Sequence, residues 1–192
     1  GLKGTLPRFG LATLGFLPLT FALWYFSGPL FTVPVELIVD AASRVALPDI
    51  VRSVEQHASV ITFITSLRPG NAAGAGALSV DVNALLYSYG MPMFAALTLA
   101  AREPGWPRKL VIGIVVLLPL VGWGVLADFL KNIAFSAGPL VTTQTGFSLA
   151  ERQAIAFAYQ FGALILPTVA PAAVWVLMHR RLLERMRTPR SA

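Results

Sequence analysis

Glu55 and His57 are the residue types that acid–base catalysis or metal binding could use. One residue separates them in a stretch with several β-branched residues, so an extended backbone would place both on one face. Arg68 and Asp81 belong to the same hydrophilic segment and could join them. However, a lone histidine in a strand more often faces solvent than binds a metal. We therefore expect no catalytic and no metal site here, and an enzyme acting through Glu55 and His57 is the third-ranked hypothesis.

A second group of charged residues lies at the ends of two very apolar stretches. Asp128 and Lys131 are three residues apart, which places them on one helical face, and Glu151 and Arg152 precede the last apolar run. They could form an ion-pair cluster that holds two helices together. Alternatively, each could be solvated at the membrane boundary, where an exposed ion pair contributes little stability. Both interpretations stay open, and neither is catalytic.

The composition is that of a membrane protein. Of the 192 residues 56% are hydrophobic and 12% are charged, whereas soluble domains carry about 25% charged residues. The mean hydropathy is +0.70. The chain has no cysteine, which excludes disulfides, thiolate metal sites and a cysteine nucleophile. The sequence indicates no cofactor.

Four uncharged runs are long enough to cross a bilayer: residues 9–31, 82–101, 110–127 and 154–178. None contains Asp, Glu, Lys, Arg or His, which weakens hypotheses of an ion pump or a transporter. A cleaved signal peptide is the alternative for the first run, but its apolar region would span about 7 to 15 residues. We therefore expect an uncleaved anchor and one integral membrane domain over residues 1–192.

The segments between the first two runs predict two further structures. Residues 34–48 alternate polar and apolar residues at helical spacing, with Pro34 in the first turn and Pro48 after the end, which predicts an amphipathic helix in the membrane interface. Residues 49–81 contain two or three strand-like stretches and predict a small extracytoplasmic segment with a β-sheet. A helix over residues 59–67 stays open as the alternative. Residues 68–77 predict a glycine-rich turn.

Polar and small residues in the runs indicate where helices pack. Asn83, Tyr87 and Tyr89 start the second run, at a depth where amphipathic rings are expected without any ligand. Ser148 and Glu151 match a capping box that would start the last helix. A small-residue stripe at four-residue intervals would let another helix approach closely. Its members are Ala154, Ala158 and Gly162.

The distribution of charge indicates the orientation. The N-terminus, the connection between the second and third runs and the C-terminal tail hold ten basic residues against two acidic ones. The remaining segments hold five basic against seven acidic residues. The positive-inside rule therefore predicts that both termini are cytoplasmic and that the connections at residues 32–81 and 128–152 lie on the other side of the membrane. We interpret the basic tail as a topology signal that contacts anionic lipids, and we expect no nucleic-acid partner.

Four stretches resemble the exosortase H-associated membrane proteins of Gram-negative bacteria. They are LPLTFALWY at residues 17–25, SVEQ at 53–56, NALLYSYGMP at 83–92 and GWGVLAD at 122–128. The resemblance implies partnership with an exosortase, a membrane enzyme that processes C-terminal sorting signals of exported proteins. An exosortase uses a cysteine nucleophile, so a chain without cysteine is not that enzyme.

These observations predict a mainly α membrane protein with four transmembrane helices, an interfacial helix and a small extracytoplasmic sheet. We expect a non-catalytic accessory subunit whose partners are other integral membrane proteins and membrane lipids. A small transporter or lipid-handling protein is the second hypothesis, with a midplane site near Tyr87, Tyr89 and the proline-broken last helix. The candidate packing or partner contacts are Asn83, Tyr87, Tyr89, Asp128, Lys131, Ala154, Ala158 and Gly162.

Overall fold

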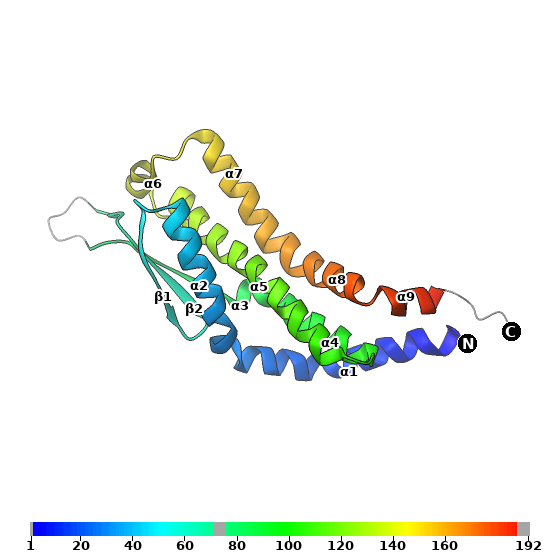
Figure 1. Ribbon diagram of the computed structural model, residues 1–192. Helices are drawn as coiled ribbons and strands as arrows, with labels where there is room; N and C mark the ends of the chain where they lie inside the picture. The colour runs from blue at the N-terminus through cyan, green and yellow to red at the C-terminus, as the bar shows by residue number, and fades with distance from the viewer. Residues whose placement is uncertain (1, 71–75, 188–192) are drawn as a thin grey trace.

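The protein is mainly helical, with a small sheet at one end, in a computed structural model that describes residues 2–70 and 76–187. Residues 71–75 of the predicted turn and Arg190 of the basic tail lie outside the described residues. The start of the first helix and the last helix lie at one end of the molecule, and the sheet lies at the other (Figure 1). In chain order the elements are α1 (Leu2–Phe26), α2 (Gly28–Ala46), β1 (Val51–His57), β2 (Val60–Thr65), β3 (Ser79–Asn83), α3 (Leu85–Ser88), α4 (Gly90–Ala101), α5 (Trp106–Lys131), η1 (Asn132–Ser136), α6 (Pro139–Thr145), α7 (Leu149–Gln160), η2 (Phe161–Ile165), α8 (Leu166–Met178) and α9 (Arg180–Arg187).

The sheet is an antiparallel meander in the order β1-β2-β3. Its central strand β2 alternates half-buried with buried residues, as a strand with one covered face should. The buried residues are Ile61, Phe63 and Thr65, and they face α2 and α5, against which the sheet packs. The predicted sheet is confirmed, and the alternative of a helix over residues 59–67 is wrong.

Three helical segments are long and apolar enough to cross a membrane: Pro7–Phe26, Trp106–Ser136 and Leu149–Met178. They correspond to the first, third and fourth predicted runs. In the second predicted run, Val82 and Asn83 belong to β3, and the helical part is the shorter apolar segment Leu85–Ala101. Four transmembrane helices therefore remain a prediction.

The chain turns at Ser27, where α1 ends and α2 begins at a steep angle to it (Figure 1). The first predicted run was therefore too long, and the predicted helix from residue 34 begins at Gly28. The reason is that Pro29, rather than Pro34, occupies the first turn, and Pro34 lies inside the helix. One side of α2 is buried against α5 and β1, and it includes Val35 and Val39.

The last long helix bends without breaking. The π-helical turn η2 joins α7 to α8, and Pro167 follows in the first turn of α8, where a missing backbone N–H is tolerated. A second π-helical turn, η1, ends the α5 helix before Gly138 and Pro139. The expected proline-broken last helix is therefore wrong, because Leu149–Met178 is one continuous helical segment that contains both Pro167 and Pro171.

Candidate functional site

A short stretch from Asn83 to Gly90 joins the sheet to the helices and contains three of the predicted contact residues. The Asn83 Oδ1 accepts a hydrogen bond from the backbone N–H of Leu85 at 3.0 Å, which starts the turn from β3 into α3. Tyr87 and Ser88 are buried, and Tyr89 is half-buried. The stretch therefore forms a packed junction, which we call the helix junction.

Tyr87 is the central side chain of the helix junction. Its ring lies against the backbone of α5 at Gly124, where an added Cβ would lie 2.6 Å from the ring. Its hydroxyl interacts with Asp128 and with Tyr159 of α7. Tyr87 thus links α3, α5 and α7 through one buried side chain.

Asp128 collects the polar contacts at this end of α5. Its carboxylate pairs with Lys131 at 3.1 Å and accepts a hydrogen bond from the Asn132 side chain at 3.1 Å. The Lys131 ammonium also lies 4.4 Å from the centre of the Tyr159 ring, a cation–π contact between α5 and α7. Because Asp128 and Lys131 are mostly covered, with 13% and 29% of their side chains exposed, this pair is screened less than a surface pair.

The other two charged residues do not join this pair. Glu151 accepts a hydrogen bond from the backbone N–H of Ser148 at 2.8 Å, and the Ser148 hydroxyl accepts one from the Glu151 backbone at 3.2 Å. The predicted capping box is therefore present. Arg152 lies 4.9 Å from the centre of the Phe135 ring. Charged residues therefore connect α5 to α7 through Lys131 and Tyr159, and η1 to α7 through Phe135 and Arg152.

The helix junction also touches α1 and α8. The Trp24 indole N–H of α1 donates to the Ser88 hydroxyl at 3.0 Å. A Cβ on Gly90 would lie 2.2 Å from the Pro167 carbonyl oxygen and 2.3 Å from the Pro171 ring. Only glycine permits this approach of α4 to α8. The junction thus contacts both α1 and α8 and fixes the positions of these two helices together.

Two members of the predicted small-residue stripe lie at a helix–helix contact. Gly162 is buried, and an added Cβ would lie 2.8 Å from the Trp123 ring of α5. The Trp123 indole N–H donates to the Ala158 carbonyl oxygen at 3.0 Å. Ala154 is exposed and lies apart from this contact.

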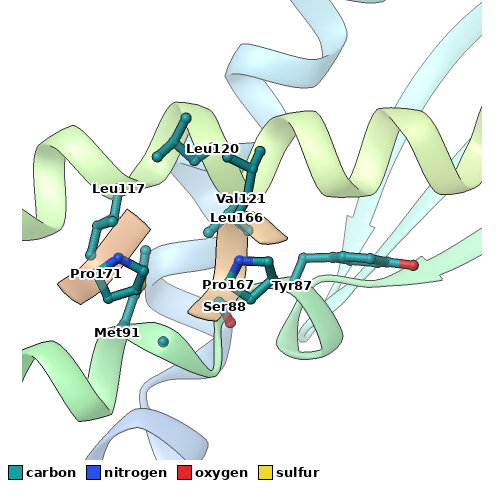
Figure 2. A pocket seen from close by; sticks show the side chains of 10 residues that line it. Tyr87, Ser88, Met91, Leu117, Leu120, Val121, Leu166, Pro167 and Pro171 are labelled. Carbon is teal, nitrogen blue, oxygen red and sulfur yellow. The ribbon is translucent and has the colours of Figure 1, made fainter. Parts of the chain in front are cut away.

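The cavity beside the helix junction is the size of one water molecule. Its volume is about 10 Å³, and residues of α3, α4, α5 and α8 line it. Figure 2 shows Pro167 and Pro171 closing it from one side, while the Tyr87 ring points away from them. Side chains thus fill the place where the second hypothesis would locate a midplane substrate site.

Glu55 and His57 lie on the exposed face of β1, two residues apart. Thr62 of β2 is paired with Glu55 in the sheet, and its hydroxyl donates to the Asp81 carboxylate at 2.7 Å. Within residues 2–70 and 76–187, no group of three His, Asp or Glu side chains could hold a metal ion. The side chains of this group form an open sheet surface and do not enclose a pocket. The group consists of Glu55, His57, Thr62 and Asp81.

The sequence did not indicate a second polar cluster at the opposite end of the bundle. His179 follows α8, is fully buried, and stacks on Trp175 with ring centroids 4.9 Å apart. Its Nε2 lies 3.9 Å from the Glu103 carboxylate, which also pairs with Lys109. Burial lowers the pKa of His179 below its usual value, and Lys109 adds to that effect, while the Trp175 carbonyl and Glu103 oppose it. A histidine at the start of a basic tail gives no signal of such burial.

A family model described as exosortase H-associated membrane protein matches residues 3–182. The match covers nearly the whole chain and confirms the resemblance that the four sequence stretches indicated. The membrane class inferred from the composition agrees with this description and with the three apolar helical segments. No curated protein and no solved structure matches the chain.

Proposed function

The chain belongs to the exosortase H-associated membrane protein family, and from this premise we propose that it is a non-catalytic accessory subunit of a bacterial inner-membrane complex. Its partner in this proposal is an exosortase-type protein-sorting enzyme. The observation that carries the proposal is the family match over residues 3–182. The family is described as associated with exosortase H, and this chain has no cysteine with which to perform that enzyme's reaction.

The use of the polar residues supports a structural role. Trp24 and Ser88 connect α1 to α3, and Lys131 and Tyr159 connect α5 to α7. The cavity beside the helix junction has room for about one water molecule. A transporter would need a larger space between its helices. The geometry therefore favours a scaffold over the transport hypothesis.

The surface of α1 supports the presence of an integral partner. Only 6% of the apolar window of Pro7–Phe26 is buried within the chain, against 39% for Trp106–Ser136. Leu19, Leu23 and Phe26 in the second half of α1 are 53 to 80% exposed. Helices associate in membranes mainly by close packing, so α1 offers a long surface to another transmembrane helix.

The proposed topology has four crossings and both termini in the cytoplasm. The segment Trp106–Ser136 has 31 residues, about 46 Å of helix, which exceeds the roughly 30 Å hydrocarbon core. If the helix enters the core at Lys109, it reaches the far boundary near Phe129, about 20 residues later. In this topology Asp128 and Lys131 lie at the outer boundary, the sheet is extracytoplasmic and α2 lies along the interface.

One experiment tests the subunit proposal directly. The protein is extracted from its native host in mild detergent and analysed by native mass spectrometry. We expect a complex that contains an exosortase-type enzyme. Recovery of the monomer alone, in several mild detergents, would refute the proposal.

Two further measurements separate the parts of the proposal. The double variant Glu55→Ala/His57→Ala should support processing of a sorting substrate as well as the unchanged chain does. Loss of processing with an intact complex would favour the enzyme hypothesis.

A reporter that is active only in the periplasm should be inactive when it is fused after Arg190. Activity of that fusion would overturn the orientation.

A further inference from the structure

We propose that a cleft formed by α1, the end of α4 and α9 binds the phosphate of an anionic glycerophospholipid. We call it the arginine cleft. Its volume is about 530 Å³, and two arginines from different elements, Arg8 and Arg102, line it together with apolar side chains. The apolar lining includes Phe9, Leu11, Ala12 and Leu182. The inference does not depend on the proposed partner complex.

The charge of the arginine cleft matches a lipid phosphate. Arg8 and Arg102 are both exposed, and neither takes part in the ion pairs found among residues 2–70 and 76–187. Arginine presents a planar fork of N–H groups that fits two phosphate oxygens at once. A phosphate between these side chains would place one negative charge beside two positive charges.

The shape of the arginine cleft matches the rest of the lipid. Leu11 lines the cleft and is 70% exposed, and Leu14, one turn further along α1, is 64% exposed. An apolar path therefore leads from the arginines along the membrane-facing side of α1. This combination of a basic rim and an apolar wall suits a headgroup with acyl chains and would leave most of the wall uncovered by a free phosphate.

The backbone at Arg102 is an independent sign that its side chain has a role. Arg102 ends α4 in the left-handed conformation, with φ of 47°. Glycine is the usual residue at such a position because it has no Cβ to strain, and the same turn uses Gly105 at φ of 77°. An arginine at residue 102 therefore accepts strain that glycine would avoid, while it supplies a charge to the cleft.

The test measures lipid retention on the full-length protein by native mass spectrometry. The purified protein is mixed with phosphatidylglycerol, with phosphatidylcholine or with inorganic phosphate, at matched concentrations. We expect retention of phosphatidylglycerol in preference to phosphatidylcholine, and no displacement by inorganic phosphate. Equal retention of both lipids, or displacement by free phosphate, would overturn the proposal.

Variants locate the binding. Arg8→Gln and Arg102→Gly should each weaken retention of phosphatidylglycerol about five-fold, the equivalent of about 1 kcal/mol per basic residue near the membrane surface. Arg108→Gln is the matched control, because Arg108 is an exposed arginine near the start of α5 that does not line the cleft. Arg102→Gly also relieves the left-handed strain, so we expect its unfolding temperature to be no lower than that of the unchanged protein, and this temperature is measured together with lipid retention. An equal loss in Arg108→Gln, or no loss in Arg8→Gln and Arg102→Gly, would contradict the assignment.

Discussion

Phe63 of β2 and Phe129 of α5 stack face to face, with ring centroids 4.1 Å apart and ring planes 10° apart. Both side chains are fully buried. The pair joins the centre of the sheet to the C-terminal end of the helix that also carries Asp128 and Lys131. This contact fixes the sheet on the helical bundle, so in the proposed topology it also sets the position of the surface that the sheet presents to a partner.

Phe129→Ala should therefore loosen the sheet from α5. Truncation of a buried phenylalanine costs about 3 to 5 kcal/mol, and we expect a marked fall in the unfolding temperature of the detergent-solubilised protein. Phe26→Ala is the control, because Phe26 is 80% exposed. A similar loss of stability in both variants would show that the stacked pair contributes no more to stability than an exposed phenylalanine does.

The contact between Tyr87 and Asp128 should appear as a coupling energy. Tyr87→Phe removes the hydroxyl that interacts with Asp128, and we expect a cost of about 0.5 to 1.5 kcal/mol, the usual net contribution of one polar interaction of this kind. The double variant Tyr87→Phe/Asp128→Asn should cost less than the sum of the single variants. Tyr25→Phe, at a side chain that is 61% exposed, should have no effect. Strict additivity in the denaturation curves would argue against the contact.

The close approach of η2 to α5 should depend on Gly162. In Gly162→Ala the new Cβ would lie 2.8 Å from the Trp123 ring and 3.1 Å from the Gly124 Cα. The helices must separate or the indole must move, and such overpacking costs about 1 to 3 kcal/mol. Gly10→Ala is the matched control, because an added Cβ there meets no atom within 4 Å. Thermal unfolding in detergent distinguishes the two variants, and equal stability of both would mean that η2 tolerates a larger residue at this contact.

Hydropathy and spacing predicted the elements better than their ends. Uncharged runs located three long helices, and alternation located the strands, because each pattern reports one covered face. The sequence could not show that Val82 and Asn83 would extend β3 rather than begin a helix, since both are compatible with either structure. The start of α2 was misplaced because Pro29 and Pro34 each suit a first turn.

The sequence also predicted some features of the candidate site and missed others. Local signals predicted the capping box at Ser148 and the close helix approach at Gly162, because each depends on residues three or four positions apart. Contacts between distant segments, such as Trp24 with Ser88 and Phe63 with Phe129, leave no trace in a single sequence. The burial of His179 was missed for this reason, since it depends on α8 packing against the turn that contains Glu103.

The buried His179 should make stability depend on pH. Burial lowers its pKa in the folded protein below 6.5. As pH falls through about 6.5, the unfolded chain binds a proton that the folded chain does not. Stability is therefore fully present above pH 6.5 and should fall below it, by at most about 1.4 kcal/mol per pH unit for one proton.

The measurement is the unfolding temperature of the protein in detergent between pH 7.5 and 5.5, a range that lies above the usual pKa of carboxyl groups. We expect the temperature to fall with pH in the unchanged protein and to vary much less in His179→Gln. His57→Gln is the matched control, because His57 is the other histidine of the chain and lies exposed on β1. A pH dependence that persists in His179→Gln and disappears in His57→Gln would assign the titration to the sheet instead.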